Sequence, residues 1–270
     1  MANVPYSNFV LENKLEDQFA THLNLAQFCK VDTSLSGVAG MTKKINVYAA
    51  TNGTEKLTLG KGNTKSIEAS VTSKDYEILL AQNHGVWFDE EQMEDPYIGY
   101  TITRHAATDM FNTMNADILA EFAKASLEAP LTGNDYFAAF VDAQAMLEVE
   151  AVDAGAPMAF ALVSPAVLAK MRKALKDDLK YNESFARSGY VGTVAGTPIY
   201  VSKAVGDEEI IFATREACTL FVKSGAEVEL YQANNRSDDA ANKRRNDLFT
   251  RKYYVAALTD ATKAVRITLA

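Results

Sequence analysis

The stretch Asp95–Pro130, "DPYIGYTITRHAATDMFNTMNADILAEFAKASLEAP", separates two parts of the chain that have different sequence patterns. Asp95 is a favourable helix N-cap residue, Pro96 suits the first turn of a helix, and no further proline appears until Pro130. The stretch therefore predicts one long helix over about 96–128. At 1.5 Å per residue, about 30 residues would form a rod of about 45–50 Å, whereas the mean helix has roughly 11–12 residues.

The apolar residues of this predicted helix recur at spacings of four and eight. They are Ile98, Ile102, Met110, Met114, Ile118 and Phe122. Because a helix has 3.6 residues per turn, such a stripe drifts by about 40° every four residues, so we expect the rod to pack against different elements along its length. Charged side chains such as Arg104, Asp117 and Lys124 exclude a membrane-spanning helix.

Ahead of the helix, residues 41–88 alternate apolar and polar side chains, which predicts strands broken by turns at Asn52-Gly53, 60–63 and 83–85. The tip of this region, about 51–74, is rich in Gly, Thr, Ser, Asn and Lys and has few apolar residues to bury. We therefore expect a hairpin that projects from the body and is mobile in a free subunit. Residues 8–30 have apolar spacings that fit a helix or an extended arm.

The stretch "LTLGKGNTKS" at 57–66 raises the question of a phosphate-binding loop. A Walker loop that ends at Lys65-Ser66 requires Gly at positions 59 and 64, which are Leu59 and Thr64. The alternative register on Gly60-Lys61 places Gly62 where Ser or Thr is required. The glycines are therefore interpreted as turn residues.

After the predicted helix comes a compact α/β region. The sequence predicts helices over 134–148, capped by Asn134, and from Pro165, capped by Ser164, with the buried strand "MAFALV" between them. A hairpin that turns near Ala195-Gly196 follows, then strands at "EIIFAT" and "AEVELYQ", with "REACTLFV" as a short helix or strand. Residues 234–247 are predicted to be a polar connection, and two β runs separated by 259–261 close the chain.

The composition, 48% hydrophobic and 23% charged over 270 residues, is that of a globular protein with one elaborate domain or two smaller ones. The net charge of −8 predicts that the surface repels nucleic acid, so that any DNA contact is local. The N-terminus lacks a signal-peptide pattern and no stretch is long enough to cross a bilayer, which favours a cytoplasmic protein. Cys29 and Cys218 form no C-x-x-C pair, so they are expected to be reduced and partly buried.

The motifs of catalytic and cofactor sites are missing from the sequence. His22, His84 and His105 lie in no H-x-x-x-H or H-E-x-x-H arrangement, and there is no G-x-S-x-G or G-x-G-x-x-G. The acidic run over 89–95 has no metal-loop spacing, and carboxylates just ahead of a helix also complement its N-terminal dipole. We therefore expect no catalytic residue, cofactor or metal site.

One basic cluster is interleaved with the aromatic residues Phe249, Tyr253 and Tyr254. It consists of Lys243, Arg244, Arg245, Arg251 and Lys252. Basic and aromatic residues together can bind nucleic acid. Because the chain is acidic overall, the cluster is interpreted instead as an exposed face or an interface with an acidic neighbour, for which the run at 89–95 is a candidate.

The order of these parts resembles the major capsid proteins of tailed double-stranded DNA bacteriophages, whose α+β fold is the Hong Kong 97-type fold. The phrases "GYVGTVAGTPIYVSKAV" and "TRKYYVAALTDATKAVRIT" also look familiar from that family. The resemblance covers nearly the whole chain. The family's segments would map to an N-terminal arm at 1–40, an E-loop at 41–75, a peripheral domain with the spine helix at 76–131, an axial α/β domain at 132–232, and peripheral return strands at 233–270.

The resemblance implies a structural protein, not an enzyme, whose pentamers and hexamers close into an icosahedral shell around the DNA genome. It also implies a virion location, assembly in the host cytoplasm with scaffolding and portal proteins, decoration proteins in some members, and only weak, non-specific contact with packaged DNA. The chain starts without the long helical segment that some relatives cleave, which favours a separate scaffolding protein unless the chain is already processed. The acidic net charge suits a container that must not adhere to its contents.

The resemblance also suggests which residues lie at subunit contacts. The candidates are Lys56, Lys61, Lys65, Glu90, Glu91, Glu94, Lys243, Arg244, Arg245 and Arg251. Some members of the family ligate Lys to Asn between subunits, and the three lysines of the hairpin lie where such a lysine could be. Asn234, Asn235 and Asn242 could be acceptors by position only.

Two other classes remain open. An encapsulin, which is a cellular nanocompartment shell of the same fold, would assemble alone and load an enzyme, and gene neighbourhood would separate it from a phage protein. An enzyme built on the 132–232 region should expose a pocket with convergent polar groups and perturbed pKa values. The motif search gives that class little support.

Overall fold

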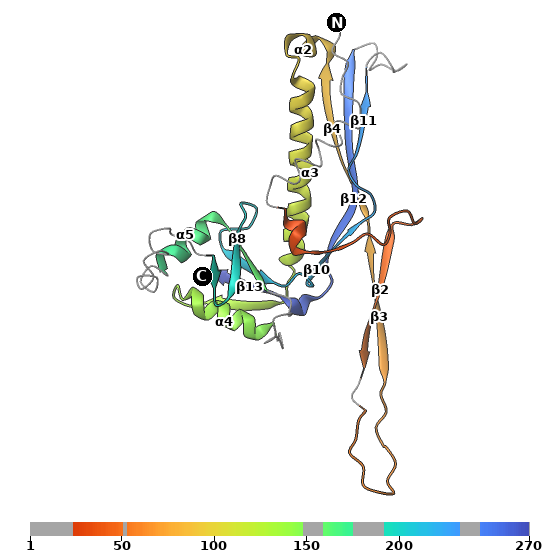
Figure 1. Ribbon diagram of the computed structural model, residues 1–270, viewed down its shortest axis with the longest axis vertical. Helices are drawn as coiled ribbons and strands as arrows, with labels where there is room; N and C mark the ends of the chain where they lie inside the picture. The colour runs from red at the N-terminus through yellow and green to blue at the C-terminus, as the bar shows by residue number, and fades with distance from the viewer. Residues whose placement is uncertain (1–23, 51–52, 148–158, 175–191, 233–243, 270) are drawn as a thin grey trace.

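The computed structural model describes residues 24–50, 53–147, 159–174, 192–232 and 244–269. Figure 1 shows three parts: a tall rod in which a long helix lies beside long strands, a compact α/β lobe to one side, and a thin two-stranded hairpin that extends away from both. The predictions for the N-terminal arm up to residue 23, for His22 and for residues 233–243 lie outside the described residues.

The long helix is α3, Ile98–Phe122, and a short helix α2, Asp89–Glu94, precedes it. The prediction of one long helix is confirmed, but both predicted ends are wrong. Asp95 accepts hydrogen bonds from Tyr97 N (2.9 Å, to Oδ1) and from Ile98 N (3.1 Å, to its carbonyl), so Pro96 lies in a turn before the helix.

The helix ends early because the residues after it pair as a strand, β5, Leu127–Leu131. This strand runs parallel to β13, Ala264–Leu269, at the edge of a sheet. An edge strand tolerates Pro130, which has no N–H to donate to a ladder. Pro130 therefore marks a strand and not the end of the helix.

The two halves of α3 pack against different elements, as the drifting stripe predicts. Its first half contacts β4, Leu79–Phe88, and β12, Arg245–Leu258, in a core that includes Trp87, Met110 and Leu248. A Cβ added at Gly85 of β4 would lie 2.4 Å from Cγ2 of Ile102, so the glycine permits this close approach. The second half joins a core with η1, Leu25–Phe28.

The five-stranded sheet is built around β12. One edge of β12 pairs with β4 from Arg245↔Phe88 to Tyr254↔Leu79, so β4 is continuous and the predicted turn at 83–85 is wrong. The other edge pairs with β11, Glu227–Tyr231, and then β10, Cys218–Val222. The short strand β1, Lys30–Asp32, lies parallel to β10. Because β12 begins at Arg245, residues 245–247 of the predicted polar connection belong to a strand.

The α/β lobe contains a six-stranded sheet with the order β5-β13-β9-β6-β8-β7. The strands not yet introduced are β6, Phe160–Val163, β7, Thr193–Val194, β8, Thr197–Val201, and β9, Glu209–Ala213. The helices α4, Tyr136–Met146, and α5, Pro165–Ala174, pack beside it (Figure 1). Its core includes Phe140, Val163 and Phe212.

Two of the three turn and cap predictions for the lobe are confirmed. Ala195 and Gly196 both have positive φ (48° and 78°) and form the predicted turn between β7 and β8. Ser164 Oγ accepts from Val167 N at 3.2 Å and caps α5. The cap of α4 is Asp135, which accepts from Ala138 N at 3.0 Å; Asn134 instead has a φ of 77° in the preceding turn.

Strand pairing divides the chain differently from the ranges that the resemblance implies. The strand β13, in the range 233–270, belongs to the six-stranded sheet, while β10 and β11, in the range 132–232, belong to the five-stranded sheet. The short helix η4, Ala261–Lys263, links β12 to β13. The two sheets are therefore tied together by several chain crossings.

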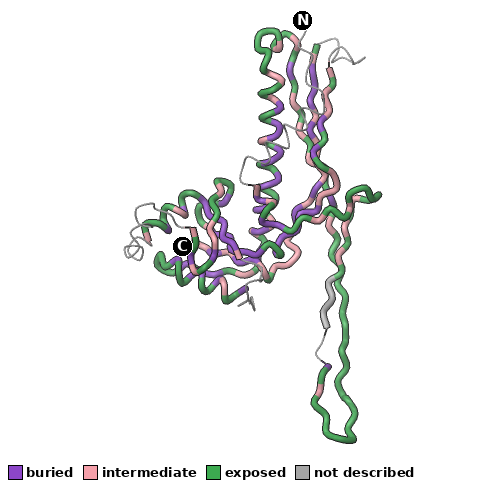
Figure 2. The backbone as a smooth tube through the Cα atoms, in the orientation of Figure 1, coloured by how far each residue is buried: buried purple, intermediate pink, exposed green. Residues whose placement is uncertain are grey.

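The hairpin consists of β2, Thr42–Ala50, and β3, Ala69–Glu77, paired from Thr42↔Glu77 to Ala50↔Ala69. Its presence as a projecting element confirms the prediction. Figure 2 shows that it is exposed along nearly all of its described length, in contrast to the buried strands of the body.

Candidate assembly surfaces

The hairpin is fixed at its base and uncovered beyond it. At the base, Ile78 N donates to the carbonyl of Met41 (2.6 Å), and the Tyr76 ring stacks on Phe221 at 5.3 Å. Ile78 is buried in the same small cluster as Phe221. The strand β3 is exposed at every position except Tyr76, which is half-buried. Within the described ranges, the contacts that anchor the hairpin therefore lie at its base.

The loop beyond the strands carries the three candidate lysines, Lys56, Lys61 and Lys65, and all three are exposed. The loop is held by short-range bonds, such as Thr64 N and Oγ1 donating to the Glu55 carboxylate at 3.0 and 2.8 Å. These two bonds lower the pKa of Glu55. A strand follows this loop, whereas a phosphate-binding loop leads into a helix N-terminus. The structure therefore agrees with the interpretation of the glycines as turn residues.

Apolar side chains on the hairpin face solvent. Leu59 is fully exposed (108% of its reference area), Ile67 is 68% exposed and Leu57 is 49% exposed. A two-stranded hairpin alone is only marginally stable in water, and exposed apolar area can serve as a contact surface, so this end of the hairpin is a candidate contact surface. No residue of the described chain covers this end of the hairpin (Figure 1).

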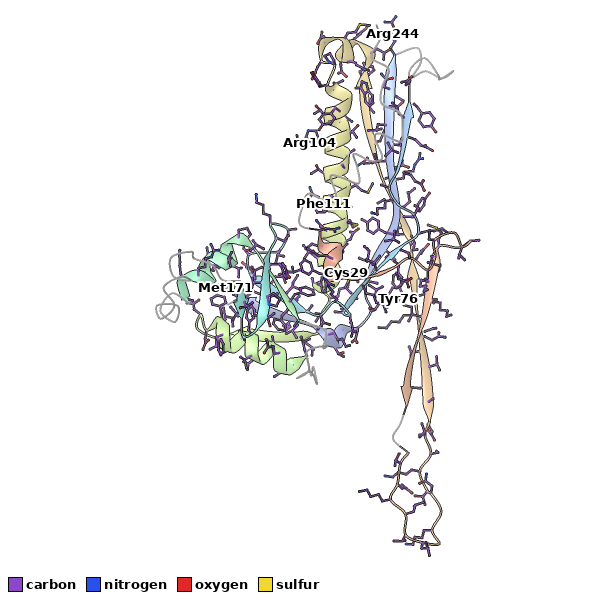
Figure 3. All side chains as sticks on the ribbon, viewed as in Figure 1. Cys29, Tyr76, Arg104, Phe111, Met171 and Arg244 are labelled. Atoms are coloured by element: carbon purple, nitrogen blue, oxygen red, sulfur yellow. The ribbon has the colours of Figure 1, made fainter. Side chains whose placement is uncertain are left out.

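The opposite end of the molecule brings the candidate acidic and basic residues together. Asp89 N donates to the Arg244 carbonyl at 3.0 Å, and Asn246 Nδ2 donates to Asp89 Oδ1 at 2.7 Å. The acidic helix α2, with Glu90, Glu91 and Glu94, therefore lies beside the start of β12. Figure 3 shows Arg244 at this end of the rod. We call α2 together with Arg244 and Arg245 the charged tip.

All three candidate glutamates of α2 are exposed, and Glu91 also has an internal role. One of its carboxylate oxygens accepts from Phe88 N at 2.9 Å and helps to start α2. Exposed apolar side chains surround these carboxylates: Met93 is 76% exposed and Tyr97 is 73% exposed. The charged tip therefore offers both charge and apolar area to a partner.

The basic candidates differ in whether they are paired inside the chain. Arg251 donates through Nε to Gln82 (2.7 Å) and pairs with Glu229 (2.5 Å), which lowers the pKa of Glu229. Arg245 pairs with Asp247 at 3.1 Å. Lys243 and the acceptor candidates Asn234, Asn235 and Asn242 lie outside the described residues. The guanidinium groups of Arg245 and Arg251 therefore already have anionic partners in the subunit.

A buried carboxylate beside Arg245 was not anticipated from the sequence. Asp247 is fully buried, its Oδ1 lies 2.6 Å from His84 Nε2, and Arg245 approaches the same carboxylate. The His84 ring stacks on Phe249 at 4.4 Å. His84, which lies in no metal-binding motif, therefore packs on Phe249 and also pairs with Asp247. Only the β4–β12 register, which aligns Asp247 with Val86 and Phe249 with His84, reveals the pairing.

The described residues contain no group of three or more His, Cys, Asp or Glu side chains placed to hold a metal ion. In the described part of 132–232, the pKa of Tyr136 is raised by burial and that of Glu229 is lowered by Arg251. Tyr136 belongs to the core of the lobe and Glu229 to β11, so these two groups do not converge on one site. No helix within the described ranges combines the length and apolar character needed to span a bilayer.

No protein-family model and no curated protein matches the sequence. The fold, however, is similar to that of solved shells. The capsid of a native GTA particle gives a TM-score of 0.70 at 12% identity, covering 92% of this chain and 90% of that one. The mature capsid of bacteriophage PhiM1 gives 0.69 at 12% identity, covering 90% and 85%. A virus-like particle from Pyrococcus furiosus gives 0.61 at 13% identity, covering 98% and 100%.

These matches extend over nearly the whole chain and include both sheets. The chain therefore has the α+β fold of these capsid proteins, and the fold that the order of its elements implies is confirmed.

Proposed function

We propose that the chain is a major capsid protein whose pentamers and hexamers close into an icosahedral phage shell around double-stranded DNA. The observation that carries the proposal is the hairpin, which is anchored at its base and exposes Leu57, Leu59 and Ile67 at its far end. A neighbouring subunit would cover these side chains and remove their apolar area from water. The role is structural and not catalytic.

Further partners follow from this role. Scaffolding and portal proteins would assist assembly in the host cytoplasm, decoration proteins would bind the finished shell in some phages, and packaged DNA would touch the shell only weakly. The ranges 1–40, 41–75, 76–131, 132–232 and 233–270 remain our proposed correspondence with arm, E-loop, peripheral and axial segments.

Sedimentation velocity of the purified protein tests the proposal. At micromolar concentration, alone and with a co-expressed scaffolding protein, we expect rings or shells that sediment far faster than a 29.5 kDa subunit. A species that stays monomeric under both conditions would contradict the proposed function.

A cellular nanocompartment shell of the encapsulin type is a second candidate. The match to the virus-like particle from Pyrococcus furiosus, which covers 98% of this chain and all of that one, favours keeping it. Shells that form without any scaffolding protein and contain a co-purified enzyme would support this candidate. Portal and terminase genes beside the gene would support the phage protein.

Trypsin digestion is expected to distinguish free from assembled hairpin. Lys56, Lys61 and Lys65 lie in an exposed loop with little regular backbone pairing, so trypsin should cut there rapidly in the free subunit. After assembly, the same sites should become resistant because a neighbour covers them. Peptide mapping over a time course measures both rates, and Lys44 in the paired strand β2 is the internal reference. Protection by ATP without assembly would instead indicate a phosphate-binding loop.

Replacing Lys243, Arg244 and Arg245 with Ala is expected to impair assembly of capsomers or shells. The physical reason is the loss of positive charge from the charged tip, which we propose faces the carboxylates of a neighbour such as Glu90 and Glu94. Light scattering at two salt concentrations measures the effect, and wild-type assembly should weaken at high salt if these ion pairs contribute. The double variant Lys243→Ala, Arg244→Ala is the control for folding, because it retains Arg245 and its ion pair with Asp247. Normal assembly together with loss of tight, sequence-dependent DNA binding would overturn the assignment.

A further inference from the structure

The two cysteines of the chain lie opposite each other although they are far apart in the sequence. Lys30 of β1 pairs with Thr219 of the parallel strand β10. Cys29 directly precedes Lys30 and Cys218 directly precedes Thr219, so the two cysteines occupy facing positions on the two chain segments. Cys29 is extended (φ −112°, ψ 157°), so it continues the line of β1. Neighbouring strands lie about 4.7–4.9 Å apart, within the Cα separation of about 4.4–6.8 Å that a disulfide requires.

The side chains of both cysteines point into one core. Cys29 is 6% exposed and Cys218 is fully buried, and both pack in the cluster that contains Leu25 and Phe28. The neighbouring Cys218 thiol, together with burial, raises the pKa of Cys29, whose Sγ donates to the Leu25 carbonyl at 3.8 Å. Figure 3 places Cys29 where the lower end of α3 meets the two sheets. The register and the shared core thus bring the two sulfur atoms together.

The segment that carries Cys29 is held to the body by few backbone bonds. The strand β1 has three residues and, among the described strands, pairs with β10 alone, at the edge of the sheet. The preceding helix η1 contacts α3 through a hydrogen bond in which Leu25 N donates to Asn115 Oδ1 at 3.2 Å. A covalent link from Cys29 to Cys218 of β10 would hold η1 and β1, the first described elements, against the region where the two sheets meet.

We propose that Cys29 and Cys218 form an intrachain disulfide once the protein meets an oxidising medium. The reaction requires an oxidant, for which a small-molecule disulfide is sufficient. One cysteine thiolate attacks a sulfur of the oxidant, forming a mixed disulfide and releasing one thiol; the second cysteine attacks the protein sulfur of that mixed disulfide and releases the other thiol. Two protein thiols thereby become one disulfide, and the oxidant is reduced to two thiols.

Burial accounts for the timing of this reaction. In a reducing cytoplasm the two thiols stay reduced, and outside the cell disulfides persist. Local opening of the short β1 segment exposes Cys29 to the oxidant, and the raised pKa keeps the thiolate scarce near neutral pH. Oxidation is therefore slow and becomes faster as the pH rises. The link to release from the cell rests on the proposed function, but the chemistry of the pair does not.

Peptide mapping of the wild-type chain tests the proposal. The purified protein is incubated with oxidised glutathione, its remaining thiols are alkylated under denaturing conditions, and it is digested with trypsin. We expect a loss of two hydrogen atoms per chain and a reducible link between peptides 15–30 and 216–223, which contain Cys29 and Cys218. The unassembled oxidised subunit should melt roughly 5–15 °C above the reduced one.

Cys29→Ala and Cys218→Ala are the matched controls, and each should lose both the linked peptide and the rise in melting temperature. Full alkylation of both thiols after oxidation, or links only between different chains, would overturn the proposal. Because the mapping uses wild-type protein, it is independent of how well the variants fold. A negative result here with normal shell formation would reject the disulfide and leave the proposed function intact.

Discussion

Replacing residues 51–68 with Asn-Gly is expected to abolish shell formation while leaving the subunit folded. Ala50 and Ala69 are cross-strand partners, so a two-residue Asn-Gly turn can join β2 to β3 without a change of register. The replacement removes Leu57, Leu59 and Ile67, whose exposed apolar area we propose a neighbour covers. The hydrogen bonds from Thr64 to Glu55 and from Asn63 to the Gly53 carbonyl lie within the loop itself, so their removal takes no contact from the body.

Sedimentation and thermal melting together measure this result. The shortened chain should sediment as a subunit, and its melting temperature should stay within about 2 °C of the wild-type value, since exposed changes alter stability little. Shells formed by the shortened chain would contradict the proposed role of the hairpin. A fall in melting temperature of many degrees would show that the loop supports the body.

A matched control separates docking from covalent crosslinking. Changing Lys56, Lys61 and Lys65 to Arg keeps three positive charges but removes the primary amines that a Lys–Asn link requires. If the hairpin docks without covalent bonds, shells should form as in the wild type and run as single subunits on a denaturing gel. If these lysines crosslink, wild-type shells should give a ladder of oligomers that the variant lacks.

Phe122→Ala is expected to have the largest effect on the stability of the subunit. Phe122 is fully buried at the end of α3, and its ring meets Phe160 of β6 at 6.1 Å in an edge-to-face arrangement. It therefore joins the spine helix to the six-stranded sheet. Truncating a buried Phe to Ala lowers the free energy of unfolding by about 3–5 kcal/mol, from a total that is typically about 5–15 kcal/mol. Urea denaturation followed by circular dichroism measures the loss.

Phe137→Ala provides the matched control for this substitution. It is the same chemical change on α4, but Phe137 is 55% exposed. We expect its effect on the free energy of unfolding to stay within about 1 kcal/mol in the unassembled subunit. Equal losses in the two variants would contradict the view that Phe122 joins the end of α3 to the six-stranded sheet.

The sequence predicts the elements of this fold better than it predicts their ends. The apolar stripe from Met110 to Phe122 has helical spacing and is buried along one face, so a long helix was predictable. The end of the helix was not predictable, because residues 127–131 form a strand only through their pairing with β13. Pro130 lacks a backbone N–H, but this does not disrupt an edge strand. Strand β4 was split at 83–85 in the prediction because Asn, His and Gly favour turns, whereas ten cross-strand pairs with β12 determine its conformation.

The candidate contact residues illustrate the same limit. Exposure of the hairpin lysines follows from local composition, and it was anticipated. The partners of Arg251 and Arg245 were not, because Glu229 and Asp247 are brought beside them by strand register. Cys29 and Cys218 were interpreted separately for the same reason: only the pairing of β1 with β10 places them together. Predicting interactions between distant segments requires the strand topology, and the periodicity of apolar residues in the sequence does not determine it.

Cryo-electron microscopy of the assembled protein tests the central claim most directly. We predict closed shells built from rings of five and six subunits, with density for residues 53–68 lying on a neighbouring subunit and covering Leu57, Leu59 and Ile67. Purified protein that gives only separate subunits, or shells in which this hairpin contacts no neighbour, would contradict the account.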